Sequence, residues 1–225
     1  MRVFDDLAKY LGNPRNVGAV LDGLLQHVYL SLAPVLIGLL LAIPLGWLAQ
    51  RTRWLRTVFL GTANIVYTIP SLALFVVIPG LLGTRITDPL NVVVALTVYT
   101  TALLVRPVID ALDSLPSPVL AAATAIGFKP AHRFFVVDLP LSIPVLTAGV
   151  RVAAVSNISL VSVGALIGTG GLGVLFTSGF GIQYLPPIIV GIVLTLLLAA
   201  LVDLTLVALR RLLTPWTRLG TGGAP

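Results

Sequence analysis

The sequence of 225 residues contains no cysteine and no glutamate, and charged residues make up only 10% of it. Without cysteine the chain has no disulfide and no thiolate metal site. Soluble globular domains carry about 25% charged residues, so this shortage of charge excludes an ordinary soluble domain. Hydrophobic residues make up 57% of the chain, and its mean hydropathy is +1.06. These values predict an integral membrane protein.

Motifs for catalysis are also missing. The chain lacks the phosphate-binding pattern G-x-x-x-x-G-K-[ST], so we do not expect it to hydrolyse ATP. Its two histidines, His27 and His132, are each interpreted as a polar residue at a helix end. No pair of carboxylates lies in the middle of an apolar run, where ion-driven carriers usually place ionisable groups. The net charge of +6 is not gathered in a basic run, so we expect no nucleic acid partner.

Five apolar segments are long enough to cross a bilayer, which takes about 20 helical residues. They cover residues 28–50, 58–82, 90–109, 140–163 and 185–209. Pro70 should kink the second segment or split it into two half-helices within one crossing. The predicted fold class is therefore an all-α membrane protein with five transmembrane helices. Residues 164–184 are rich in glycine, but their G-x-G-x-x-G spacing lacks the preceding strand that a dinucleotide site requires.

Basic residues accumulate on the cytoplasmic side of membrane proteins, and their distribution here predicts the N-terminus outside and the C-terminus inside. Residues 1–27 form a predicted extracytoplasmic or interfacial segment, residues 28–209 one transmembrane domain, and residues 210–225 a cytoplasmic tail. The four basic residues outside are then Arg2, Lys9, Arg15 and Arg85. The ten inside are Arg51, Arg53, Arg56, Arg106, Lys129, Arg133, Arg151, Arg210, Arg211 and Arg218.

The predicted cytoplasmic loop over residues 111–140 contains signals for two short helices. Ser117 is placed to cap the first helix, and Pro118 fits its first turn. Gly127 can adopt the left-handed conformation that ends such a helix, and Pro130 is placed to begin a second one. We therefore expect two short helices around a glycine corner outside the bilayer.

The stretch from Ala121 to Pro140, AAATAIGFKPAHRFFVVDLP, resembles the EAA loop of ABC importer permeases. In that loop Glu-Ala-Ala is followed by three residues, a glycine, nine residues and Ile-x-Leu-Pro. Gly127 and the closing Leu-Pro keep this spacing, whereas Ala121 replaces the glutamate. The resemblance implies that the loop docks on a separate ATPase subunit. The residues assigned to docking are Ala121, Ala122, Ala123, Gly127, Phe128, Lys129, Pro130 and Arg133.

Residues 67–74, YTIPSLAL, and residues 139–173, which end in ALIGTGGLG, resemble the permeases of osmoprotectant importers. The resemblance implies a methionine-permease-like type I fold in a bacterial cell membrane. It also implies a non-catalytic permease for glycine betaine, carnitine, choline and proline betaine-like quaternary amines. The implied partners are a like or unlike second permease, membrane lipid, an extracytoplasmic solute-binding protein, and ATPase subunits that bind the ATP and magnesium. Two alternatives stay open: an importer of amino acids such as methionine, and an ATPase-independent channel or structural membrane protein.

Polar residues within the spans are candidates for the translocation path, although such residues also serve helix packing. Tyr67 or Tyr99 can hold a trimethylammonium group against an aromatic face. The full set is Asn64, Tyr67, Thr68, Pro70, Ser71, Tyr99, Thr100, Thr101, Ser156, Asn157, Ser159 and Ser162.

Arg151 lies inside the fourth span, where an unpaired charge is costly. Asp203, in the fifth span, lies at a comparable distance from the cytoplasmic end. We therefore predict a structural ion pair between Arg151 and Asp203. Asp110, Asp138 and a water-lined vestibule are the alternatives.

Overall fold

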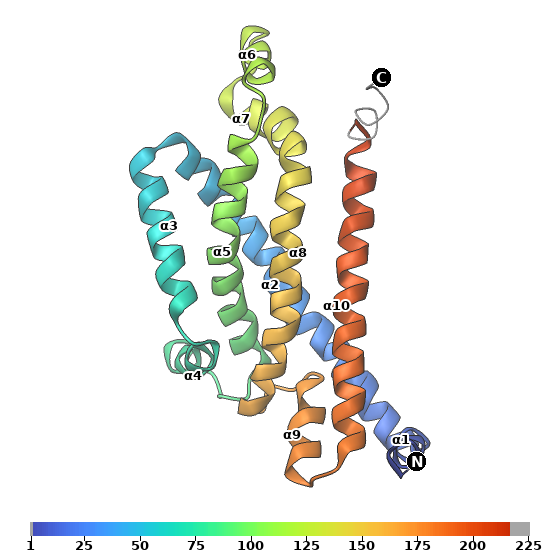
Figure 1. Ribbon diagram of the computed structural model, residues 1–225. Coiled ribbons are helices and arrows are strands. Elements are labelled where there is room, and N and C mark those ends of the chain that lie inside the picture. Colours follow the sequence, from blue (N-terminus) through green and yellow to red (C-terminus); the bar gives the residue numbers. More distant parts are fainter. Residues whose placement is uncertain (1, 217–225) are drawn as a thin grey trace.

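The structure is a computed structural model that describes residues 2–216, and within this range every regular element is helical. Figure 1 shows long helices side by side, with short helices at both ends. The elements are α1 (Arg2–Leu11), α2 (Pro14–Arg51), α3 (Arg53–Thr68), α4 (Ser71–Leu82), α5 (Pro89–Asp113), α6 (Ser117–Ala125), α7 (Pro130–Arg133), the π-helical turn η1 (Phe134–Asp138), α8 (Leu139–Gly164), the 3-10 turn η2 (Ala165–Ile167), α9 (Gly173–Gly181) and α10 (Leu185–Leu213). Residues 217–225 of the predicted tail, with Arg218, lie outside the described residues.

Four helical stretches are long and apolar enough to cross a bilayer, namely α2, α5, the run Pro130–Ile167 and α10. Helices α3 and α4 pass the same test together, as one broken span. Counted this way the spans number up to five, as the sequence predicts. Figure 1 places the C-terminal ends of α2 and α10 at the same end as α6 and α7, and α1, α4 and α9 at the opposite end.

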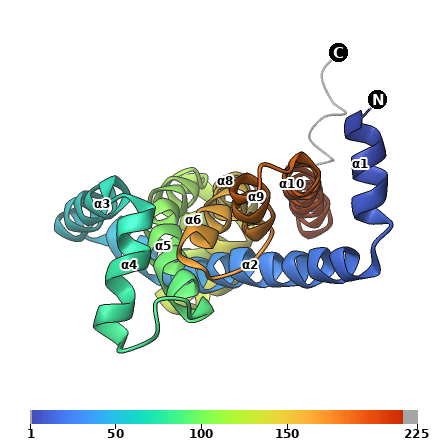
Figure 2. The same cartoon turned by 90° about the horizontal axis from the view of Figure 1, so that it is seen from below.

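The second span is split at Pro70 into two half-helices that meet at 102°. Proline has no N–H to donate, and it pushes the preceding residue into an extended conformation. Ile69 adopts φ −68° and ψ 129° accordingly. Its carbonyl, which lies outside both helices, accepts a hydrogen bond from the Tyr99 hydroxyl of α5. Helix α4 consequently lies across the long helices: Figure 1 shows it end-on and Figure 2 along its length.

Helix α2 begins earlier than the first predicted span. The Asn13 side chain accepts a hydrogen bond from the Arg15 N–H at 3.0 Å, and Pro14 starts the helix. The boundary predicted between residues 27 and 28 therefore falls inside one helix of 38 residues. At about 57 Å, α2 is longer than the hydrocarbon core is thick, about 30 Å. Figures 1 and 2 show it running obliquely along one face of α5 and α8.

Glycine allows α2 and α5 to pack closely. A Cβ on Gly38 would lie 2.6 Å from Thr100 Cγ2, and one on Gly46 would lie 2.4 Å from Val108 Cγ1. Small residues at helix crossings let backbones approach each other in a membrane, where dispersion drives packing. The α2–α5 crossing therefore requires glycine at both positions.

The Gly46→Ala variant should have a lower melting temperature in detergent, because its new methyl group overlaps Val108 and overpacking costs about 1–3 kcal/mol. Gly61 in α3 is the matched control, since nothing lies within 4 Å of its Cβ position. Gly61→Ala should keep or raise the melting temperature, because alanine favours helix over glycine by about 1 kcal/mol. Equal losses in both variants would contradict the close crossing.

Candidate functional site

The predicted glycine corner is present at the end of α6. Gly127 has a φ of +92°, which favours glycine. The Gly127 N–H donates to the Thr124 carbonyl at 3.0 Å, and the Phe128 N–H donates to the Ala123 carbonyl at 3.2 Å. This pair of hydrogen bonds is the Schellman motif, which satisfies the last carbonyls of a helix. The corner therefore has a defined shape set by the backbone itself.

The helix boundaries around the corner differ from the prediction. Ser117 is the first residue of α6 rather than its cap, and Pro116 occupies the cap position. Pro130 begins a helix as predicted, but α7 continues through η1 into α8, so a separate second short helix is wrong. The wide π turn of η1 ends two residues before Pro140, whose ring would clash with the carbonyl four residues earlier in a regular helix.

Arg133, predicted as a docking residue, contacts its own chain. Its Nε lies 3.3 Å from the buried Asp138 carboxylate, and its Nη1 donates to Thr124 Oγ1 at 3.1 Å. The Trp47 ring of α2 packs against the Phe134 ring of η1, with centroids 5.2 Å apart. These contacts fasten α6 and the C-terminal part of α2 to the π turn.

The other docking candidates form a mostly exposed surface. Phe128 is part-buried, and its ring lies 5.0 Å from the His132 ring. Ile126, which the sequence reasoning missed, is 74% exposed beside the corner. The exposed candidates are Ala121, Ala122, Gly127, Lys129 and Pro130, whereas Ala123 is buried. Ile126 thus adds a large exposed apolar side chain to the surface of the docking candidates.

Several translocation-path candidates gather around the break in the second span. The rings of Tyr67 in α3 and Tyr99 in α5 lie 6.0 Å apart, edge to face. Tyr99 is buried and its hydroxyl is used by Ile69, whereas Tyr67 is 52% exposed. Of the two predicted cation-binding rings, only Tyr67 thus presents an accessible face. Near it the exposed candidates are Asn64, Thr68 and Pro70, and the part-buried one is Ser71.

Thr100 and Asn157 meet in the interior. Asn157 Nδ2 donates to Thr100 Oγ1 at 2.8 Å and to the Ser31 carbonyl at 3.3 Å. All three residues are at most 2% exposed, and they join α5, α8 and α2. Interhelical hydrogen bonds of this kind tie membrane helices together. These residues therefore link helices, and nothing local in the sequence marks Ser31 as their partner.

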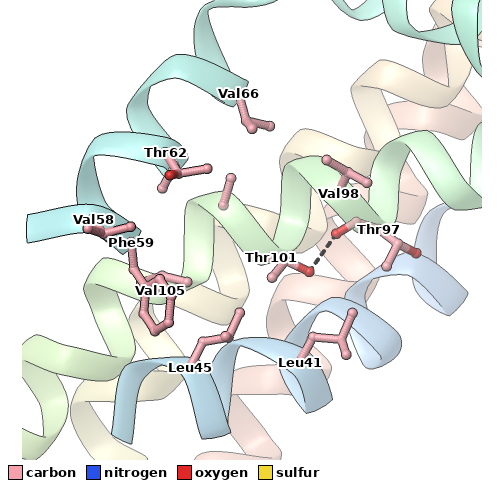
Figure 3. A pocket seen from close by; sticks show the side chains of 12 residues that line it. Leu41, Leu45, Val58, Phe59, Thr62, Val66, Thr97, Val98, Thr101 and Val105 are labelled. Carbon is pink, nitrogen blue, oxygen red and sulfur yellow. Dashed lines mark hydrogen bonds between the residues drawn. The ribbon is translucent and has the colours of Figure 1, made fainter. Parts of the chain in front are cut away.

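Thr101 lines a pocket of about 400 Å³ between α2, α3 and α5. Figure 3 shows leucine and valine side chains pointing into this pocket from all three helices. The Thr101 hydroxyl donates to the Thr97 carbonyl at 2.7 Å, and the Thr97 hydroxyl donates to the Val93 carbonyl at 2.7 Å. These two hydroxyls are satisfied within α5, Thr62 of α3 is the third threonine of the lining, and no acidic group lines the pocket. The pocket therefore suits an apolar occupant rather than a cation.

The three serine candidates lie on α8. Ser159 is exposed, and Ser156 and Ser162 are part-buried. The Ser162 hydroxyl makes no hydrogen bond within the described residues. The structure therefore brings together Tyr67 with Tyr99 and Thr100 with Asn157, but it does not gather all twelve candidates around one cavity.

Two residues of α2 that the sequence reasoning missed hold the glycine-rich segment at the other end. The Gln26 side chain accepts a hydrogen bond from the Gly171 N–H at 3.0 Å. His27 is fully buried inside α2 rather than at a helix end. The Leu172 N–H donates to His27 Nδ1 at 3.1 Å, and His27 Nε2 lies 2.9 Å from the Ile158 carbonyl. Because Nδ1 accepts, the ring carries its proton on Nε2.

Arg151 and Asp203 form a bidentate ion pair between α8 and α10. Arg151 Nε lies 2.6 Å from Oδ1 of Asp203, and Arg151 Nη2 lies 2.7 Å from Oδ2. Two parallel N–H···O bonds fix orientation as well as distance. A second pair, Arg56 with Asp113 at 2.8 Å, joins the ends of α3 and α5 at the exposed surface.

Helices that are long and apolar enough to cross a bilayer, joined by a glycine-cornered loop, define a helical membrane protein. Residues 35–217 match the family described as binding-protein-dependent transport system inner membrane component, and the chain belongs to this family. It is accordingly a transport subunit of the bacterial inner membrane.

The osmoprotectant import permease protein OsmW of Salmonella typhimurium is 37% identical, with 89% of this chain and 94% of that protein covered. The choline transport system permease protein OpuBB of Bacillus subtilis is 32% identical, with 89% and 91% covered. A structure of the MetNI methionine ABC transporter in an inward-facing conformation matches with a TM-score of 0.81 at 23% identity, covering 90% of this chain and 99% of that one. This likeness confirms the predicted methionine-permease-like fold.

The single variants Arg151→Met and Asp203→Leu should each lower the melting temperature in detergent, because each leaves one charge of the pair without its partner. The double variant should lose less than the sum of the two single losses, since no lone charge remains. Thermal unfolding of the four proteins measures this difference. Simply additive losses would mean that the two residues act independently.

Proposed function

We propose that this chain is the permease subunit of an ATP-driven importer of osmoprotectants, quaternary amines such as glycine betaine, carnitine and choline. The observation that carries the proposal is the similarity to an osmoprotectant import permease, at 37% identity over 89% of this chain. A second relative is named for choline transport, and choline shares the trimethylammonium group. The proposed substrate class therefore rests on relatives aligned over nearly their whole length.

The two alternatives have less support. The likeness to a methionine transporter is a likeness of fold at 23% identity, so it does not favour methionine as the solute. An ATPase-independent channel or structural protein is disfavoured because the family is one of binding-protein-dependent transport. Competition between solutes for uptake separates an importer of amino acids such as methionine from an importer of osmoprotectants.

The proposed coupling surface is α6 with its glycine corner. Ile126 and the exposed alanines of α6 offer an apolar surface to an ATPase subunit, and the Schellman motif fixes its shape.

ATP and magnesium would be bound by that ATPase, so this chain is non-catalytic and needs no cofactor. A second permease subunit completes the membrane part, surrounding lipid contacts it, and an extracytoplasmic binding protein delivers the solute. Within the membrane, Tyr67 is the proposed aromatic contact for the trimethylammonium group.

Uptake of labelled glycine betaine tests both the solute and the coupling surface. Unlabelled choline or carnitine should compete for uptake, and methionine should not.

Gly127→Val should lower uptake by about tenfold, because a left-handed backbone costs a branched L residue about 1–2 kcal/mol and distorts the corner. Gly127→Asn is the matched control, since asparagine tolerates this conformation, and it should retain uptake. Both variants must reach the membrane in equal amounts. Normal uptake by Gly127→Val would count against the coupling role, and competition by methionine alone would support the alternative.

We also propose that α6 faces the cytoplasm, on the basis of the ten-to-four distribution of basic residues. Because the chain has no cysteine, single cysteines can report the orientation. Thr52 and Thr87 are a matched pair of exposed threonines in the α2–α3 and α4–α5 connections. An impermeant maleimide added to intact cells should label Thr87→Cys and miss Thr52→Cys until the membrane is permeabilised. The reverse pattern would invert the orientation.

A further inference from the structure

An apolar cleft of about 550 Å³ lies between α2, α8 and α10, outside the surfaces assigned above. Its walls are leucine, valine, isoleucine and alanine side chains, with Thr147, Thr205 and Arg210 as the polar exceptions. The Thr147 hydroxyl donates to the Ile143 carbonyl and the Thr205 hydroxyl to the Leu201 carbonyl, each at 2.7 Å. Both hydroxyls are thus satisfied within their own helices, and the cleft offers an occupant an apolar channel with one cationic group.

The cleft has the dimensions of a single hydrocarbon chain. Along α10 its lining residues run from Leu198 to Leu213, about 22 Å at the helical rise. One leaflet of the hydrocarbon core is about 15 Å deep, so the cleft passes through a leaflet and reaches its surface. Divided by the 22 Å length along α10, the cleft volume of about 550 Å³ corresponds to a mean cross-section of about 25 Å², which is roughly 6 Å across. A long and narrow cleft of this shape matches an extended acyl chain better than a helix, which with its side chains is about 10–12 Å wide.

Arg210 stands at the end of the cleft that faces the membrane surface. All three tryptophans, Trp47, Trp54 and Trp216, lie near the helix ends on this side, and tryptophan gathers at the headgroup level. Basic groups between helices at this level bind anionic lipid headgroups. The end of the cleft is therefore positioned where a phospholipid phosphate lies.

The Arg210 guanidinium is available to a phosphate. Among residues 2–216 no hydrogen bond or ion pair involves its side chain. The carboxylates of Asp113, Asp138 and Asp203 are already paired with Arg56, Arg133 and Arg151. An arginine can bind a phosphate through two parallel hydrogen bonds. We propose that the cleft holds one acyl chain of an anionic phospholipid of the bilayer, with its phosphate bound by Arg210.

The test uses the full-length chain, delipidated in detergent and supplied with phosphatidylglycerol or phosphatidylcholine. Native mass spectrometry counts bound lipid, and thermal unfolding measures its effect. The wild-type chain should bind phosphatidylglycerol about tenfold more tightly than Arg210→Gln does, because hydrogen bonds to charged groups contribute at least this much. Arg53→Gln, which removes an exposed arginine outside the cleft, is the matched control and should bind like wild type.

The acyl chain is tested separately from the headgroup. Thr205→Trp should block the cleft and abolish binding of both lipids, whereas the isosteric Thr205→Val should keep it. Equal binding of the two lipids by the wild-type chain, or full phosphatidylglycerol binding by Arg210→Gln, would overturn the proposal. So would stabilisation by inorganic phosphate equal to that by the lipid, which would mean a free anion. Disulfide formation between two copies of Leu209→Cys would instead show a protein partner over the cleft and would also overturn it.

Discussion

The contact between α2 and α5 is the constraint on which the other helices depend. Because Gly38 and Gly46 carry no side chain, Thr100 and Val108 pack directly on the α2 backbone. This closeness lets Asn157 of α8 reach both α5 and the α2 backbone with one amide group. Helix α5 also packs against α3. The loop that carries α6 is therefore mounted on the two helices, α5 and α8, that the crossing positions.

Irregularities in the bundle are compensated by polar groups from elsewhere in the chain, as a bilayer interior without water requires. The Ile69 carbonyl, left outside the helices by Pro70, is satisfied by Tyr99. The π turn places Asp138 in a buried position, where Arg133 neutralises it. These pairings give the carbonyl at the break and the carboxylate at the π turn a polar partner within the chain.

The sequence predicted the features that depend on local chemistry. Span lengths follow from hydropathy, the break follows from Pro70, and the glycine corner follows from the backbone freedom of Gly127. What it missed depends on contacts between distant segments. His27 is hydrogen-bonded to a residue 145 positions away, and nothing near it in the chain indicates burial. The contact between the Trp47 and Phe134 rings likewise joins α2 to η1, two segments that are far apart in the sequence.

Helix α2 contacts structural elements at both ends of the helical bundle. Its residues His27 and Trp47 are fastened to the glycine-rich segment and to the π turn, respectively. The two residues are 20 positions apart, about 30 Å along the helix axis, a length comparable with the thickness of the hydrocarbon core. The helix is thus held by contacts near both ends of this stretch. One unbroken helix thus connects the π turn at one end of the bundle with the glycine-rich segment at the other end.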